Sequence, residues 1–127
     1  MSLLEVHRKN QCLKMNNMNI ENFNNKQFNI FGTVFTIKLV DTLDKDDNLL
    51  HYGLTEGHTK EIRISKEVMN TKQPDSEIYI TLVHEIIHAV LDTGQYIEES
   101  QKDSLVEWLA RCIISLLKQD ILCKEKI

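Results

Sequence analysis

The stretch that decides the fold is TLVHEIIHAV, Thr81–Val90, in which two histidines stand four residues apart and a glutamate follows the first. On an α-helix, residues four apart lie on the same face, one turn from each other. His84 and His88 can therefore reach one ion through their imidazole nitrogens, which are common zinc ligands. Glu85 is rotated by about 100° from His84 and would flank the ion, where its carboxylate can take a proton from water, as in other H-E-x-x-H motifs.

The residues around the two histidines indicate an otherwise apolar helix with clear ends. Pro74 stands before the helix, and Asp75 or Ser76 can cap its first turn. Gly94 follows the last apolar residues and is typical of a helix end, so we place the helix near residues 76–92. The other residues of the motif are uncharged, which predicts a helix that is apolar nearly all round and buried. They are Leu82, Val83, Ile86, Ile87, Ala89 and Val90.

Burial makes ionisable side chains on this helix costly. A lone carboxylate in apolar surroundings is unfavourable unless something compensates its charge, and a bound cation does so. The alternative is an ordinary buried histidine pair that hydrogen-bonds to backbone groups or carboxylates. Because His84, Glu85 and His88 are hard to satisfy in that way on one apolar helix, the pattern favours a metal site over a purely structural role.

The segments before the motif helix have the composition of β-strands. β-branched and aromatic residues dominate QFNIFGTVFTIKLVD, residues 27–41, so we expect a strand there, with Gly32 marking a bulge or bend. Apolar and polar residues alternate in LLHYGLTEGHTKEIRIS, residues 49–65, which predicts two short strands joined by a tight turn around Gly57. Together these segments predict a small antiparallel sheet ahead of the helix.

A second long helix is predicted near residues 99–118, in EESQKDSLVEWLARCIISLLKQ. Ser100 with Asp103 resembles a capping box at its start. One apolar stripe runs along the helix, and further apolar residues widen it. The stripe consists of Leu105, Leu109, Cys112 and Leu116, widened by Val106, Ile113 and Leu117.

The expected fold class is therefore α+β, with a small antiparallel sheet packed on two long helices. Residues 1–29 are rich in asparagine, which favours turns over the interiors of helices and strands, so we expect an irregular N-terminal arm there. Residues 30–127 then form a single domain, a size that suits one hydrophobic core.

A catalytic zinc ion usually has three protein ligands and one open position, so a third ligand is expected. The candidates are Glu98, Glu99, Asp103, Glu107, His51 and His58. Those at the start of the second helix are explained without a metal, because acidic residues there favour the helix dipole. Glu107 is different, since SLVEWLARCII is mostly apolar and Ala110 and Ile114 share its face. Arg111, four residues on, could pair with Glu107 in a helix salt bridge instead, but Glu107 is the favoured third ligand.

Composition excludes several other classes of protein. The chain has 127 residues, 42% of them hydrophobic, and a net charge of −4 without a basic block, so we expect no nucleic-acid partner. No apolar run reaches membrane-spanning length, so we expect no membrane association. The cysteines, Cys12, Cys112 and Cys123, are odd in number and scattered, which argues against a disulfide framework and fits a reducing cytoplasm.

The run TLVHEIIHAV resembles the signature of the zincin metallopeptidases, in which an uncharged pair such as Ile86 and Ile87 stands between the glutamate and the second histidine. A glutamate from a following helix as third ligand is the thermolysin-like, or gluzincin, arrangement, and Glu107 lies nineteen residues after His88. The order of sheet, motif helix and acidic second helix is similar to small metallopeptidases of the ImmA/IrrE kind. It is also similar to short H-E-I-I-H-A proteins of phages and prophages. The resemblance covers residues 50–118.

The resemblance implies a zinc-dependent peptidase acting on a peptide or protein substrate. In that arrangement His84, His88 and Glu107 hold Zn²⁺, and Glu85 is the general base that activates water. The oxyanion needs a further donor, for which the chain offers a few side chains. They are His51, Tyr52, His58 and Tyr96.

A different class of function shares the same pattern. The chain is far shorter than thermolysin-like enzymes, and a protein-binding module that keeps the zincin shape without catalysis, of phage or mobile-element origin, has the same sequence features. Glu85 discriminates between the two, because a purely structural zinc site has no use for an acid or base at that position.

Overall fold

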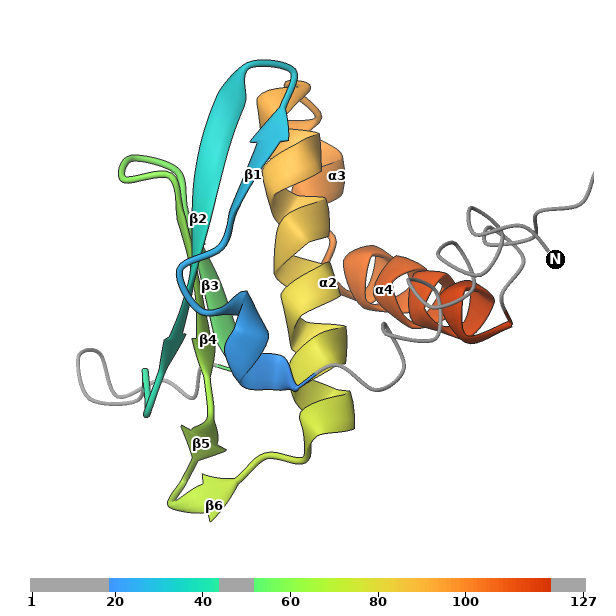
Figure 1. Ribbon diagram of the computed structural model, residues 1–127. Helices are drawn as coiled ribbons and strands as arrows, with labels where there is room; N and C mark the ends of the chain where they lie inside the picture. The colour runs from blue at the N-terminus through green and yellow to red at the C-terminus, as the bar shows by residue number, and fades with distance from the viewer. Residues whose placement is uncertain (1–18, 44–51, 120–127) are drawn as a thin grey trace, which may run out of the picture.

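The computed structural model describes residues 19–43 and 52–119. This part of the chain has the expected α+β architecture, with helices packed against a four-stranded sheet and a small two-stranded sheet that leads into the longest helix (Figure 1). Within these residues, no helix is both long enough and apolar enough to cross a membrane.

The strand expected over residues 27–41 is a β-hairpin. β1 (Gln27–Ile30) and β2 (Thr33–Val40) pair antiparallel across the two residues Phe31 and Gly32. Both residues have positive φ, 47° and 96°, as a type I′ hairpin turn requires, and glycine adopts this backbone at little cost. The side chain of Asn29 accepts a hydrogen bond from the Gly32 N–H at 2.6 Å. Gly32 therefore marks a chain reversal instead of a bulge.

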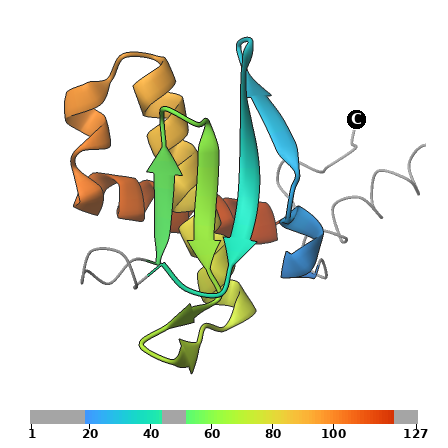
Figure 2. The same ribbon diagram turned by 90° about the vertical axis from the view of Figure 1, so that its left-hand side faces the viewer.

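The expected pair of strands around Gly57 is confirmed. β3 (Gly53–Glu56) pairs antiparallel with β4 (Glu61–Ser65), and the sheet has the order β1-β2-β4-β3. After β2 the chain forms β3 at the outer edge and returns as β4 beside β2, so β2 and β4 run parallel (Figure 2). The sheet is therefore mixed, and only two of its three pairings have the antiparallel direction that was expected.

The motif helix α2 (Asp75–Thr93) covers one face of the sheet. β5 (Glu67–Val68) and β6 (Thr71–Lys72) form the small ribbon that precedes it. The buried residues of α2 follow one stripe at helical spacing, and they contact the inward side chains of β2 and β4. The stripe is Ile78, Leu82, Glu85 and Ala89, and the facing core residues are Phe35, Ile37, Ile62 and Ile64.

The expectation that α2 is buried all round is wrong, because most of its other residues are half-buried and Val90 is exposed. Its end at Gly94 is confirmed. Its start differs in one detail: Pro74 is the N-cap, and Asp75 and Ser76 already belong to the helix. Pro74 has no side-chain cap hydrogen bond, so α2 depends on its packing against the sheet.

The N-terminal arm expected over residues 1–29 is too long at its C-terminal end. Residues 1–18 lie outside the described part, but the 3₁₀-helix η1 (Ile20–Phe23) and β1 belong to the folded domain. Ile20 is buried in the main core, and the Phe23 ring packs edge-on against Tyr79 of α2 with ring centroids 5.5 Å apart. The apolar residues among the asparagines anchor this segment, which a composition argument overlooks.

The second long helix is divided into two. α3 (Ile97–Ser100) is a short helix beside the end of α2, and α4 (Asp103–Lys118) crosses α2 (Figure 1). The expected capping box is wrong, because Ser100 ends α3 and no side chain caps α4. The residues of α4 that are buried are Val106 and Ala110. The expected stripe is not the buried face: Leu105, Leu109, Ile113 and Leu116 are exposed, and Cys112 and Leu117 are half-buried.

Candidate metal centre

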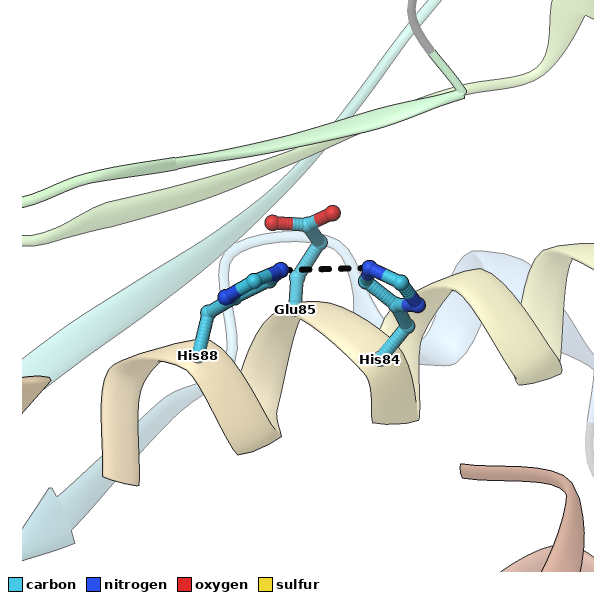
Figure 3. A group of neighbouring side chains, drawn as sticks. All are labelled: His84, Glu85 and His88. Atoms are coloured by element: carbon cyan, nitrogen blue, oxygen red, sulfur yellow. Dashed lines mark hydrogen bonds between the residues drawn. The ribbon is translucent and has the colours of Figure 1, made fainter. Parts of the chain in front are cut away.

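The two histidines of the motif face each other. One turn of α2 separates them, and their Nε2 atoms lie 3.1 Å apart (Figure 3). The ring centroids are 4.9 Å apart, and the side chains are only 17% and 16% exposed. His84 and His88 thus present one nitrogen each to the same point, as the helical spacing predicts.

The other nitrogen of each ring, Nδ1, also has a hydrogen-bond partner. His84 Nδ1 lies 3.0 Å from Glu107 Oε1 on α4, and His88 Nδ1 lies 3.0 Å from Ser100 Oγ at the end of α3. Ser100 is 5% exposed. Metal-ligating histidines commonly have such an oxygen partner, which fixes the ring orientation and the tautomer. α3 and α4 therefore fix the two imidazoles that α2 provides.

The protons of this chain of contacts can be counted. A carboxylate only accepts hydrogen bonds, so His84 Nδ1 donates to Glu107, and the Nε2 of a neutral His84 carries a lone pair. If the Ser100 hydroxyl donates to His88 Nδ1, then His88 Nε2 donates to His84 Nε2 and the chain is closed. If Ser100 accepts instead, two lone pairs face each other. In the first case a neutral N–H···N hydrogen bond joins the two rings, and in the second case the facing lone pairs call for a proton or a metal ion between them.

The geometry of the pair fits a zinc ion. Two atoms bound to zinc at about 2.0–2.1 Å on neighbouring corners of a tetrahedron lie roughly 3.3–3.4 Å apart. The observed separation of 3.1 Å between the Nε2 atoms needs only a small widening. His84, Glu85 and His88 also form a group of potential ligand atoms within 4.8 Å of one another, the only such group among the described residues.

Glu85 is buried between α2 and the edge strand. It is 7% exposed, and its carboxylate points from the helix toward the sheet (Figure 3). The Thr55 hydroxyl of β3 donates to Glu85 Oε1 at 2.7 Å and lies 3.0 Å from the Glu85 carbonyl oxygen. Within the described residues, the second oxygen, Oε2, has no hydrogen-bond partner. Thr55 therefore fixes one carboxylate oxygen and leaves the other for a ligand or water.

The close approach of β3 to Glu85 depends on Gly53. A Cβ atom at this position would lie 2.7 Å from Thr81 Cγ2, 2.9 Å from Glu85 Cγ and 3.2 Å from Glu85 Oε2. At distances this short, any side chain would displace Thr81 and Glu85 or the strand itself. The small residue at the start of β3 thus sets the distance between the edge strand and the buried carboxylate.

These residues line an open cavity of about 960 Å³ between β3, α2 and α4. Its lining includes the two histidines, Glu85, the edge strand and several carboxylates. From β3 and the loop before α2 come Tyr52, Gly53, Leu54, Thr55 and Gln73, and from the helices come Glu77, Asp92, Asp103, Glu107 and Arg111. The volume is sufficient for a small-molecule ligand or a short piece of peptide.

Two of the expected third ligands reach the histidines. Glu107 meets the outer nitrogen of His84 through Oε1, and its Oε2 accepts from Arg111 Nε at 2.7 Å, the helix salt bridge weighed as an alternative. Asp103 Oδ1 lies 3.6 Å from His88 Nε2, the nitrogen that faces His84.

The remaining candidates lie elsewhere. Glu98 and Glu99 in α3 do not line the cavity, and His51 lies outside the described residues. His58 lies in the turn between β3 and β4, and neither it nor Tyr96 lines the cavity. Of the expected oxyanion donors in the described part, Tyr52 alone does.

Sequence reasoning did not find the roles of Ser100 and Thr55. Ser100 was assigned to a helix cap, and a threonine in a strand carries no signal of its own. A usable signal did exist for the acids. Asp103 and Glu107 are four residues apart, as the histidines are, and each acid lies beside one histidine: Asp103 beside His88, and Glu107 beside His84.

Comparison of the chain with protein-family models, with curated proteins and with solved structures gives no match.

The packing at Gly53 can be tested by its replacement. Gly53→Ala should lower the free energy of unfolding by about 1–3 kcal/mol, because the added methyl group overpacks the contact with Thr81 and Glu85. Gly57→Ala is the matched control, since no atom lies within 4 Å of a Cβ there, and it should change stability by less than about 0.5 kcal/mol. Urea denaturation measures both. Equal stabilities for the two variants would contradict the close approach.

Proposed function

We propose that this protein is a zinc-dependent peptidase. The observation that supports the proposal best is the pair of Nε2 atoms 3.1 Å apart beside a buried carboxylate on the same helix. A buried histidine pair alone has many explanations. The addition of an ionisable Glu85, held at one oxygen by Thr55 and open at the other, favours hydrolytic chemistry.

In this proposal, His84 and His88 would hold a zinc ion, which would supply Lewis-acid chemistry for the scissile carbonyl and would lower the pKa of a water molecule. Glu85 removes a proton from that water through Oε2 and later delivers it to the leaving amine. The Thr55 hydroxyl keeps the carboxylate in place through Oε1. Glu107 and Ser100 hold the imidazole rings in the orientation that binding requires.

The edge strand supports a peptide as the substrate. The carbonyl of Tyr52 accepts from the Ser65 N–H at 2.9 Å, so residues 52, 54 and 56 direct their backbone groups toward β4. The alternation of an antiparallel pair then places the backbone N–H and C=O groups of Gly53 and Thr55 at the open edge, next to the cavity. An extended peptide can pair with such an edge and bring one of its carbonyl groups to the histidines.

Tyr52 is our candidate for the oxyanion donor. It directly precedes the edge strand β3, lines the cavity and is 51% exposed, so its hydroxyl is available to a substrate. A phenol can donate a hydrogen bond to the negative oxygen that develops during amide hydrolysis.

A second candidate function is a non-catalytic zincin-like module that binds another protein. The observation that favours it is the exposed apolar face of α4, where Trp108 is 65% and Leu116 48% exposed. Glu85 argues for the enzyme. Its side chain is only 7% exposed, so a protein partner would not contact it, whereas catalysis would use its unbound oxygen.

We also propose that the protein works in the cytoplasm. The described cysteine, Cys112, is free, and the three cysteines of the chain are scattered and odd in number. Such a set suits a reducing compartment.

The metal itself is the first test of the proposal. Purified protein reconstituted with zinc and then desalted should retain about one zinc per chain, because the paired imidazoles provide a preformed site. His84→Ala should lose this zinc, since one of two facing nitrogens is removed. His58→Ala is the control and should retain it, because His58 lies in the β3–β4 turn outside the cavity. Elemental analysis gives the stoichiometry. Retention of zinc by His84→Ala would contradict the site.

Catalysis is tested at Glu85. Glu85→Gln should keep the zinc and lower the rate of peptide hydrolysis by about 10²–10⁴-fold, because the amide cannot take a proton from water. Glu98→Gln, outside the cavity, is the control and should hydrolyse peptides like the parent. Mass spectrometry of a peptide library measures the cleavage. If Glu85→Gln cleaves at the parent rate, Glu85 has no part in the mechanism; if the zinc-loaded parent cleaves nothing, the binding module is favoured.

A further inference from the structure

We propose that Asp103 is the third protein ligand of the metal and that Glu107 is a positioning residue for His84. This assignment reverses the one that the sequence favours. It rests on the proposed metal site but not on catalysis, and it follows from which nitrogen of which ring each acid approaches.

Both oxygens of Glu107 are already engaged away from the metal position. Oε1 accepts from His84 Nδ1 at 3.0 Å, and Oε2 accepts from Arg111 Nε at 2.7 Å. Arg111 Nη2 also lies 3.8 Å from Glu77, so the guanidinium is anchored on two sides. The nitrogen that Glu107 contacts is the one turned away from His88. For Glu107 to bind the ion directly, it would have to break its contacts with His84 and Arg111.

Asp103 approaches the opposite nitrogen. Its Oδ1 lies 3.6 Å from His88 Nε2, close to the separation of roughly 3.3–3.4 Å that two ligand atoms show on one tetrahedral zinc ion. This distance is too long for a hydrogen bond, so among the described residues no hydrogen bond holds Asp103 Oδ1 away from a metal. Asp103 is not in the group of three whose ligand atoms lie within 4.8 Å of one another, and its oxygen therefore has to swing toward His84.

The side chain is free to make this movement. It is 85% exposed and stands at the first position of α4, where the helix dipole stabilises its negative charge. The corner between α3 and α4 encloses the His88 ring, with Ser100 on Nδ1 and Asp103 near Nε2. Because this carboxylate is exposed, its oxygens can turn toward the two facing Nε2 atoms.

The assignment gives the two acids separate tasks. Asp103 supplies a negatively charged oxygen ligand, and its exposure places it at the solvent side of the cavity. Glu107 is 40% exposed and is paired with Arg111. It accepts a hydrogen bond from His84 Nδ1, which makes Nε2 of His84 a stronger metal ligand.

Cysteine substitution with cobalt as the probe tests which acid contacts the metal. Full-length Asp103→Cys loaded with Co²⁺ should show a thiolate-to-cobalt charge-transfer band that is absent from the Co²⁺-loaded parent, because a thiolate at this position becomes a ligand. Glu107→Cys is the matched control, one turn along α4, and should show no such band. The reverse pattern, or a band in neither variant, would overturn the assignment.

Zinc affinity, measured by competition with a chelator, provides a second readout. Loss of a residue that only hydrogen-bonds to a metal ligand weakens metal binding by roughly 10–100-fold. Asp103→Asn should weaken zinc binding by more than this. Glu107→Ala should weaken it by about 10–100-fold, and Glu107→Gln should restore most of the loss, because its amide oxygen still accepts from His84 Nδ1. A larger loss for Glu107→Gln than for Asp103→Asn would overturn the assignment.

The two proposals fail in different ways. If the parent shows no cobalt d–d bands and binds no zinc, the metal site is absent and both proposals fall. If the parent binds the metals but Asp103→Asn binds zinc as tightly as the parent does, the metal site stands and only the assignment of Asp103 is wrong.

Discussion

Two imidazole nitrogens 3.1 Å apart are the constraint on which the rest of this structure depends. They cannot both present lone pairs to each other without a positive charge between them. The outer nitrogens are bound by Glu107 and Ser100, so the rings cannot turn away without the loss of buried hydrogen bonds. The fold therefore keeps the two Nε2 atoms facing each other, at a separation close to that of two ligand atoms on one zinc ion.

The architecture places a carboxylate and a strand edge beside this point. Glu85 belongs to the buried stripe of α2, so burial against the sheet directs it toward β3, and Thr55 of that strand takes one of its oxygens. Gly53 allows the strand to come this close. α3 and α4 close the other side of the histidines. A small sheet, one long helix and the corner between two shorter ones are thus sufficient to assemble the candidate site.

The local parts of this arrangement could be predicted from the sequence. Helical spacing gives the facing of His84 and His88, and the strand pair around Gly57 follows from alternation and a turn residue. The hairpin at Gly32 has a Phe-Gly turn in place of the usual Asn-Gly or Asp-Gly, and the parallel pairing of β2 with β4 is a non-local contact, so neither follows from the same rules. Likewise, Ser100 has the composition of a helix cap, and only the break between α3 and α4 turns it toward His88.

The sequence alone also does not determine which acidic residue is the third metal ligand. The apolar neighbours of Glu107 indicated a buried face, but its side chain is 40% exposed, whereas Arg111 was correctly named as a partner. A sequence does not specify which nitrogen of an imidazole faces a neighbouring helix, yet this determines whether an acid is a ligand or holds one in place. The matched spacing of Asp103 and Glu107 with the two histidines is visible in the sequence, but it becomes informative only when Asp103 is known to lie beside His88 and Glu107 beside His84.

X-ray absorption spectroscopy at the zinc edge tests the central claim most directly. The zinc-loaded full chain should show two imidazole nitrogens at about 2.0–2.1 Å, with the remaining ligands being oxygen and without a sulfur shell at about 2.3 Å. A sulfur shell would mean that cysteines capture the ion, and the absence of imidazole scattering would mean that His84 and His88 do not bind it. Either result would contradict the account of a cation held between the two facing histidines.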